Sequence, residues 1–124
     1  MDSVVHFEIP TDDLERAKKF YSSVFGWVAQ TIPEVQYTVA QTTDIGEDQR
    51  PTTPGAINGG IMARTAATPA PVITIGVDSV EDALKNIEAE GGSVVQPRTE
   101  IPNMGAFGYF KDTEGNVVGL WETM

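Results

Sequence analysis

Apolar and polar residues alternate at the start of the chain and then change to a longer period. Over residues 4–9 (VVHFEI) every second side chain is apolar, which predicts a strand with one face in a core. From Leu14 to Phe25 the apolar side chains recur at helical spacing, which predicts a helix with one apolar stripe. Asp12 with Glu15 three positions later forms a capping box before the stripe, and Gly26 is typical of a helix end.

The rest of the first half predicts three more strands and a long loop. Residues 27–32 and 35–41 are expected to form a hairpin around Pro33 and Glu34, and residues 57–62 a fourth strand. The polar segment 42–56 is rich in Pro, Gly and Thr and predicts a long loop, a functional lid or a mobile surface segment.

The second half repeats the first. If the chain is shifted so that His6 falls on Val72, Leu14 falls on Val80 and Gly26 on Gly92. The repeat predicts a strand over 72–77, a helix capped by Ser79 and ended by Gly91 and Gly92, a strand over 93–96, a loop over 97–105 and strands over 106–111 and 117–122. One such unit cannot bury its apolar face alone. We therefore predict an α+β fold in a single domain, residues 1–124, with βαβββ module one at 1–62, a linker at 63–71 and module two at 72–124.

Composition limits the chemistry. The 124 residues carry a net charge of -10, which disfavours nucleic acid and anionic membranes as partners, although its simplest role is solubility. No apolar run approaches a membrane-spanning length and no secretory signal is visible, so we expect a cytoplasmic protein. There is no cysteine and only one histidine, His6, which rules out thiolate sites and, within one chain, sites that need two or three histidines.

Three segments carry a resemblance to a known family. The opening HFEIPTDDLERAKKFYSSVFGW, the central GGI at 59–61 and the closing FKDTEGNVVGLWE together resemble the vicinal oxygen chelate superfamily, which includes glyoxalase I, bleomycin-resistance proteins and extradiol dioxygenases. The chain is most similar to the glyoxalase-like branch with two glycines in the fourth strand. The resemblance implies paired βαβββ modules whose curved mixed sheet forms a cleft, and usually a homodimer.

The same resemblance implies where a metal ion would bind. Metal-dependent members use four side chains, one from the first and one from the fourth strand of each module. The first-strand positions are matched by His6 and Val72, and the fourth-strand positions by Gly60 and Gly119. Only His6 is a ligand, and Glu8 on the same strand face adds one carboxylate, whereas zinc or nickel needs three or four ligands. We therefore expect no metal and no cofactor.

Strand parity predicts which residues face the cleft. Glu122 and Gly119 lie on opposite faces of the same predicted strand, so Glu122 does not replace the metal ligand that is missing at position 119. His6 and Glu8 are the candidate catalytic pair, because histidine ordinarily titrates near neutral pH. Trp27 and Tyr37 are expected to line the same cleft. The predicted ligand-binding residues are His6, Glu8, Asn58, Gly60, Met62, Val72, Thr74, Gly119 and Trp121.

Two classes of function stay open, beside a third in which the cleft is unused and the chain is a module of a larger assembly. The first is a bleomycin-resistance-like protein that binds a small organic molecule in the cleft between its modules without metal. The second is an enzyme, either a metal-dependent lyase, isomerase or dioxygenase like glyoxalase I, which the ligand count disfavours, or a metal-free enzyme that uses His6 and Glu8.

Overall fold

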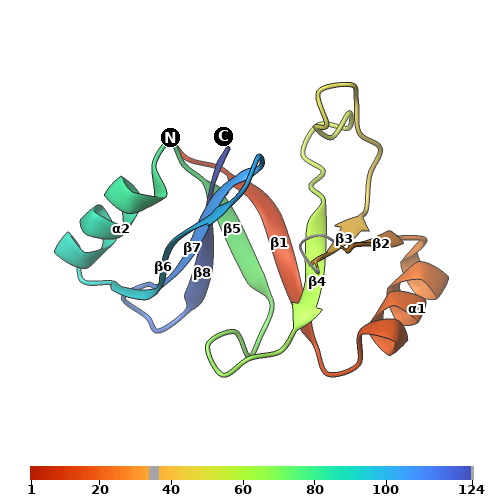
Figure 1. Cartoon of the computed structure of the whole chain (residues 1–124), viewed down its shortest axis with the longest axis horizontal. Helices are drawn as coiled ribbons and strands as arrows, with labels where there is room; N and C mark the ends of the chain where they lie inside the picture. The colour runs from red at the N-terminus through yellow and green to blue at the C-terminus, as the bar shows by residue number, and fades with distance from the viewer. Residues whose placement is uncertain (34–36, 124) are drawn as a thin grey trace. The chain divides into compact units, whose positions relative to one another are not determined.

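The computed structural model describes residues 1–33 and 37–123, so the predicted turn at Pro33 and Glu34 lies partly outside the described residues. The chain divides into two compact units (Figure 1). The first unit is residues 6–71, and the second unit is residues 1–5 together with residues 72–124. The predicted single domain and the predicted cleft between the modules stay predictions.

The first unit contains one βαβββ module. It comprises β1 (Val4–Thr11), which starts in the second unit, α1 (Leu14–Phe25), β2 (Val28–Ile32), β3 (Tyr37–Gln41) and β4 (Gly59–Ala63). The strand order is β2-β3-β4-β1, with β1 and β4 parallel and the other pairs antiparallel. β4 therefore lies between β1 and β3, which places side chains from all three strands on one sheet face.

The second unit repeats this arrangement. It comprises β5 (Val72–Gly76), α2 (Val80–Ala89), β6 (Ser93–Ile101), β7 (Gly105–Lys111) and β8 (Val117–Thr123). The order is β5-β8-β7-β6, with β5 and β8 parallel and the rest antiparallel. The predicted α+β fold of two βαβββ modules with mixed sheets is confirmed.

The helix of the second unit covers a well-formed core. Ser79 caps α2 as predicted, since its side chain accepts a hydrogen bond from the Asp82 N–H at 3.1 Å. The buried side chains of this core come from α2, β7 and β8: Val80, Leu84, Phe110, Val118 and Leu120. Burial of this apolar face supplies the main stabilisation of the unit.

Helix α1 differs from the sequence prediction in two ways. Its N-cap is Asp13, whose carboxylate accepts from the Arg16 N–H at 3.0 Å, one residue later than the capping box of Asp12 and Glu15 would place it. Its end at Gly26 is confirmed, with the left-handed φ of 75° that glycine adopts easily. The apolar stripe was expected to lie in the core, but no residue of α1 is buried.

The predicted loop over 97–105 is wrong for most of its length, because β6 continues to Ile101. Its register against β7 shifts between Val94 and Gln96 and again between Gln96 and Thr99. Pro97 lies within the second irregularity, at the outer end of the strand order, where a missing N–H removes no regular ladder bond. Neither helix in the described ranges is long and apolar enough to cross a membrane.

Candidate functional site

A hydrogen-bonded cluster of three polar side chains lies on one sheet face of the first unit. His6 and Glu8 are alternate residues of β1, so their side chains share a face. Tyr37, the first residue of β3, reaches them across β4. Its Oη lies 2.8 Å from His6 Nε2, and it donates a hydrogen bond to Glu8 Oε2 at 3.2 Å. The tyrosine hydroxyl therefore joins the imidazole to the carboxylate.

Gly60 makes this cluster sterically feasible. It lies opposite Glu8 on one side and opposite Val39 on the other. A Cβ atom built on Gly60 would be 1.7 Å from Tyr37 Oη and 2.2 Å from Tyr37 Cζ. The sequence predicts that Gly60 contacts a ligand, but the Tyr37 side chain takes the space beside it. Gly60 therefore has a structural reason to be glycine, while its role in ligand binding stays a prediction.

The hydrogen bonds define the protonation pattern of the cluster. Because the single O–H of Tyr37 is donated to Glu8, its oxygen accepts from His6, so His6 Nε2 carries a proton. Burial lowers the pKa of His6 below its usual value of 6.5, and the Glu8 carboxylate offsets part of this shift. Glu8 is 7% exposed and hydrogen-bonded, as a buried carboxylate requires. At neutral pH the imidazole is therefore neutral, with Nδ1 as its basic nitrogen.

These residues do not fit the divalent ion that metal-dependent relatives hold. With its proton on Nε2 the imidazole could offer a metal ion only Nδ1, and the facing Glu8 oxygen accepts the tyrosine hydroxyl. Among the described residues no group of three His, Asp or Glu side chains is placed to hold an ion. The usual zinc and nickel sites need more such ligands than His6 and Glu8 supply.

Other residues predicted for the first module have structural partners of their own. Asn58 Oδ1 accepts hydrogen bonds from the Thr42 N–H at 2.7 Å and the Thr43 N–H at 3.0 Å, which fixes the start of the 42–56 loop. The Met62 carbonyl accepts from the Thr11 hydroxyl at 3.2 Å. Roles of Asn58 and Met62 in ligand binding stay predictions.

Trp27 lies elsewhere than expected. Its ring stacks on Tyr21 of α1 with centroids 4.6 Å apart and contacts Phe7 at 5.5 Å. Phe7 alternates with His6 along β1, so its side chain points to the opposite face. The expectation that Trp27 lines the same surface as His6 is therefore wrong. Tyr37 contacts His6, and its place in a cleft stays a prediction.

The predicted residues of the second module lie together on the sheet face away from α2. Thr74 is opposite Gly119, and Gly76 is opposite Trp121, in the β5 and β8 pair. Val72 and Thr74 are buried, and Trp121 is partly exposed. A Cβ atom on Gly119 would lie 2.7 Å from Thr74 Oγ1, so the threonine hydroxyl covers this glycine. Phe107 and Tyr109 share this face and are absent from the predicted residues, although the alternation in residues 105–111 indicates their direction.

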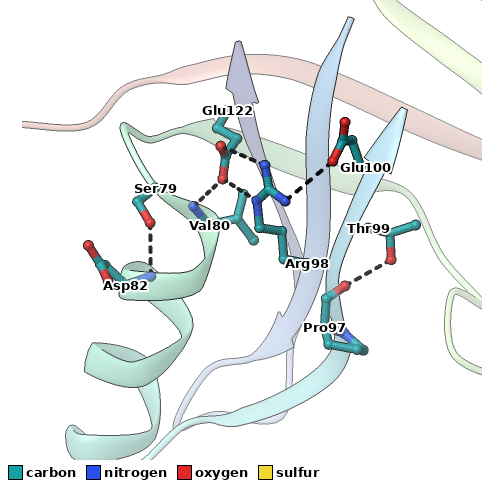
Figure 2. A network of polar contacts seen from close by, with 8 residues as sticks. All are labelled: Ser79, Val80, Asp82, Pro97, Arg98, Thr99, Glu100 and Glu122. Carbon is teal, nitrogen blue, oxygen red and sulfur yellow. Dashed lines mark hydrogen bonds and ion pairs between the residues drawn. The ribbon is translucent and has the colours of Figure 1, made fainter. Parts of the chain in front are cut away.

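Glu122 points the other way, as strand parity predicted (Figure 2). Its Oε1 accepts from the Val80 N–H at 2.8 Å and from Arg98 Nε at 2.9 Å, and its Oε2 accepts from Arg98 Nη2 at 3.2 Å. These hydrogen bonds, that to Arg98 foremost, hold the pKa of the Glu122 carboxyl below its usual 4.5. Glu122 therefore tethers the start of α2 to β6 and β8 and takes no part in the cluster around His6.

The repeated βαβββ fold, with a histidine on the first strand and a glycine on the fourth strand of each module, is that of a glyoxalase-like protein. The family model described as Glyoxalase/Bleomycin resistance protein/Dioxygenase superfamily matches residues 3–120. The chain belongs to this superfamily.

Relatives and solved structures agree with this membership. A glyoxylase-like domain-containing protein of Didymella fabae is 32% identical over 114 residues, which cover 88% of this chain and 84% of that protein. The putative glyoxylase CFP32 of Mycobacterium bovis is 31% identical over 93% of this chain, which spans only 43% of that protein. A Streptomyces coelicolor methylmalonyl-CoA epimerase in complex with 2-nitronate-propionyl-CoA shares the fold, with a TM-score of 0.66 and 17% identity, over 97% of this chain and 96% of that chain.

Proposed function

We propose that this protein binds a small organic molecule beside the His6–Tyr37–Glu8 cluster, without a metal ion on His6. The observation that carries the proposal is the position of the Tyr37 hydroxyl, 2.8 Å from the imidazole and 3.2 Å from the carboxylate. That hydroxyl is hydrogen-bonded to Nε2 of the imidazole and to one carboxylate oxygen, so neither of these two atoms is offered to an ion. The cluster is therefore built for hydrogen bonding.

The free side of the cluster is the imidazole Nδ1. Among the described residues His6 Nδ1 has no hydrogen-bond partner, and the His6 side chain is partly exposed. A neutral imidazole with its proton on Nε2 accepts a hydrogen bond at Nδ1, so a ligand with a hydroxyl or amine donor suits it. The buried Glu8 and the net charge of -10 favour a neutral or cationic ligand over an anionic one.

The relatives support a small molecule as the partner. The epimerase with the same fold is described in complex with a CoA ester derivative, and the curated relatives are described as glyoxylase-like or as putative glyoxylases. Identity to the epimerase is 17%, so the comparison supports the scaffold and leaves the choice of ligand to the residues of this chain.

A second candidate function is metal-free proton transfer. The Glu8–Tyr37 pair holds the His6 imidazole in one tautomer, and burial keeps it neutral and ready to accept a proton at Nδ1. When Nδ1 takes a proton from a bound substrate, the negative Glu8 carboxylate stabilises the resulting imidazolium through the Tyr37 hydroxyl. The metal-dependent lyase, isomerase or dioxygenase is disfavoured by the same hydrogen bonds.

The proposal is tested by combining metal analysis with a ligand screen. Protein purified without chelator is analysed for Zn, Ni, Fe and Mn, and neutral and cationic small molecules are screened for a rise in melting temperature. We expect less than stoichiometric metal, at least one binder, and weaker binding in His6→Ala and Tyr37→Phe. Tyr21→Phe on α1 is the control, because it removes a tyrosine hydroxyl remote from His6. One equivalent of metal that disappears in His6→Ala, or a screen without any binder, would refute the proposal.

We further propose that two copies of the chain associate through α1. Phe20, Val24 and Phe25 on α1 are 54%, 56% and 61% exposed, and Val28 at the start of β2 is 58% exposed. A contiguous group of large apolar side chains is usually covered by a partner. Helix α2 buries Val80 and Leu84, whereas α1 buries none of its residues. A second copy packed on α1 would supply the burial that this helix lacks.

A further inference from the structure

We infer that β2, the outermost strand of the first unit, pairs with β2 of a second copy of this chain. The two strands run antiparallel about a two-fold axis at Gln30 and join the two sheets edge to edge. The inference rests on the proposed association of two copies and names the strand that joins them, from observations separate from the exposed face of α1. It does not depend on the His6 cluster or on a bound ligand.

Strand β2 has a neighbouring strand on one side only. In the order β2-β3-β4-β1 it pairs with β3 along its whole length, Val28–Ile32, in a regular antiparallel register. In such a pair alternate residues direct their N–H and C=O groups away from the partner strand. On the outer side of β2 these groups have no backbone partner among the described residues. The strand therefore presents a row of donors and acceptors that suits a further strand.

The outer strand of the second unit, β6, has the features that keep an edge strand from pairing. Pro97 lacks an N–H, Arg98 next to it carries a charge, and the register against β7 shifts twice. Strand β2, with the sequence VAQTI, has no proline and no charged side chain, and its register is regular. Because natural proteins block the sheet edges that must stay single, this contrast marks β2 as the edge that takes a partner.

The sequence of β2 is complementary to a second copy of itself. When two such strands run antiparallel about Gln30, Val28 lies opposite Ile32 of the other copy, and Ala29 lies opposite its Thr31. The apolar side chains at the two ends then cover each other. The two Gln30 side chains meet on the axis, where each amide can donate to the carbonyl of the other. A two-fold interface requires this self-complementarity, which favours a second copy over an unrelated strand as the partner.

The side chains that this pairing covers are exposed in the single chain. Val28 is 58% exposed, and Gln30 and Thr31 are also exposed. Each copy has a net charge of -10, so two copies repel each other unless they meet through a neutral surface. The five uncharged side chains of β2 form such a surface, and a strand placed beside them covers Val28 and satisfies the outward backbone groups.

The test places a charge on the two-fold axis. Because Gln30 is exposed, Gln30→Lys should fold like the parent, but in the pair it brings two like charges directly opposite each other. We expect the dimer dissociation constant, measured by sedimentation velocity over a concentration series, to rise about tenfold or more. Gln30→Glu should have the same effect. An equimolar mixture of the two variants should associate again, because opposite charges then face each other across the axis.

Ser93→Lys is the control, because it adds the same charge to the exposed start of β6, and it should associate like the parent. The inference is overturned if the parent is monomeric at all concentrations, if Gln30→Lys associates like the parent, or if mixing the two Gln30 variants restores no association.

The variant Phe25→Lys on α1 separates this inference from the proposed contact through that helix. Dissociation of Phe25→Lys but not of Gln30→Lys would leave the contact through α1 in place and contradict pairing through β2. The reverse result would support β2 and contradict α1. Hydrogen exchange gives a second measurement, in which the backbone amides of β2 should gain protection as the protein concentration rises, and unchanged exchange in β2 would overturn the inference.

Discussion

Replacing Gly60 by alanine tests the steric link between Gly60 and Tyr37. The new Cβ would be 1.7 Å from Tyr37 Oη, far inside van der Waals contact, so the ring must move and release both His6 and Glu8. Losing one neutral hydrogen bond and one to a carboxylate costs roughly 2–4 kcal/mol. Alanine offsets up to about 1 kcal/mol of this loss, because it restricts the unfolded chain more than glycine does. We expect a net loss of about 1–3 kcal/mol in the free energy of unfolding.

A double-mutant cycle with Tyr37→Ala isolates this effect. Without the tyrosine ring the space beside residue 60 is open, so Gly60→Ala should be neutral or slightly stabilising in the Tyr37→Ala background. The free energies come from urea unfolding followed by tryptophan fluorescence. Gly119→Ala is the matched control, because its Cβ would meet the Thr74 hydroxyl at 2.7 Å, which a rotation of that side chain relieves. Equal effects of Gly60→Ala in both backgrounds, within about 0.5 kcal/mol, would refute the reasoning.

Four further variants test individual side chains and the exposed face of α1. Glu122→Ala removes the acceptor for the Val80 N–H at the start of α2, so it should lower the free energy of unfolding by about 1 kcal/mol at pH 7. Because the pKa of Glu122 is lowered in the folded state, its contribution to stability is present above pH 4.5 and is lost as the pH falls through the folded pKa. In urea titrations, the free energy of unfolding of Glu122→Gln should therefore decline less over that pH range than that of the parent protein. Burial also lowers the pKa of His6 in the folded state, so as the pH falls below about 6.5 the unfolded chain binds a proton first and the free energy of unfolding decreases. His6→Gln should flatten the plot of unfolding free energy against pH in this range. An unchanged plot would contradict the burial argument. Phe25→Lys should reduce self-association in sedimentation velocity, and a parent protein that is monomeric at all concentrations would contradict the proposed dimer.

The repeat and the strand parity were predictable because they depend on patterns that each residue type expresses locally. Alternation placed Glu122 away from Gly119, and the structure confirms that direction through its bonds to Val80 and Arg98. The end of α1 at Gly26 was predictable for the same reason, since few other residues adopt its left-handed conformation easily.

What the sequence did not reveal depends on contacts between distant residues. The partner of Gly60 is Tyr37, which lies on another strand, and no local pattern shows which side chain will occupy the space above a glycine. The continuation of β6 past Pro97 depends on irregular pairing with β7, whereas a proline by itself suggests an interruption. The exposure of the α1 stripe also depends on tertiary packing, because periodicity marks an apolar face without naming what covers it.

The most direct test of the metal-free cluster is nitrogen-15 NMR of the His6 imidazole, whose signals are unambiguous because the chain has one histidine. We predict a neutral ring at pH 7 with its proton on Nε2, unchanged by one equivalent of Zn²⁺. Loss of the Nε2 proton with a coordination shift on adding Zn²⁺ would contradict the account.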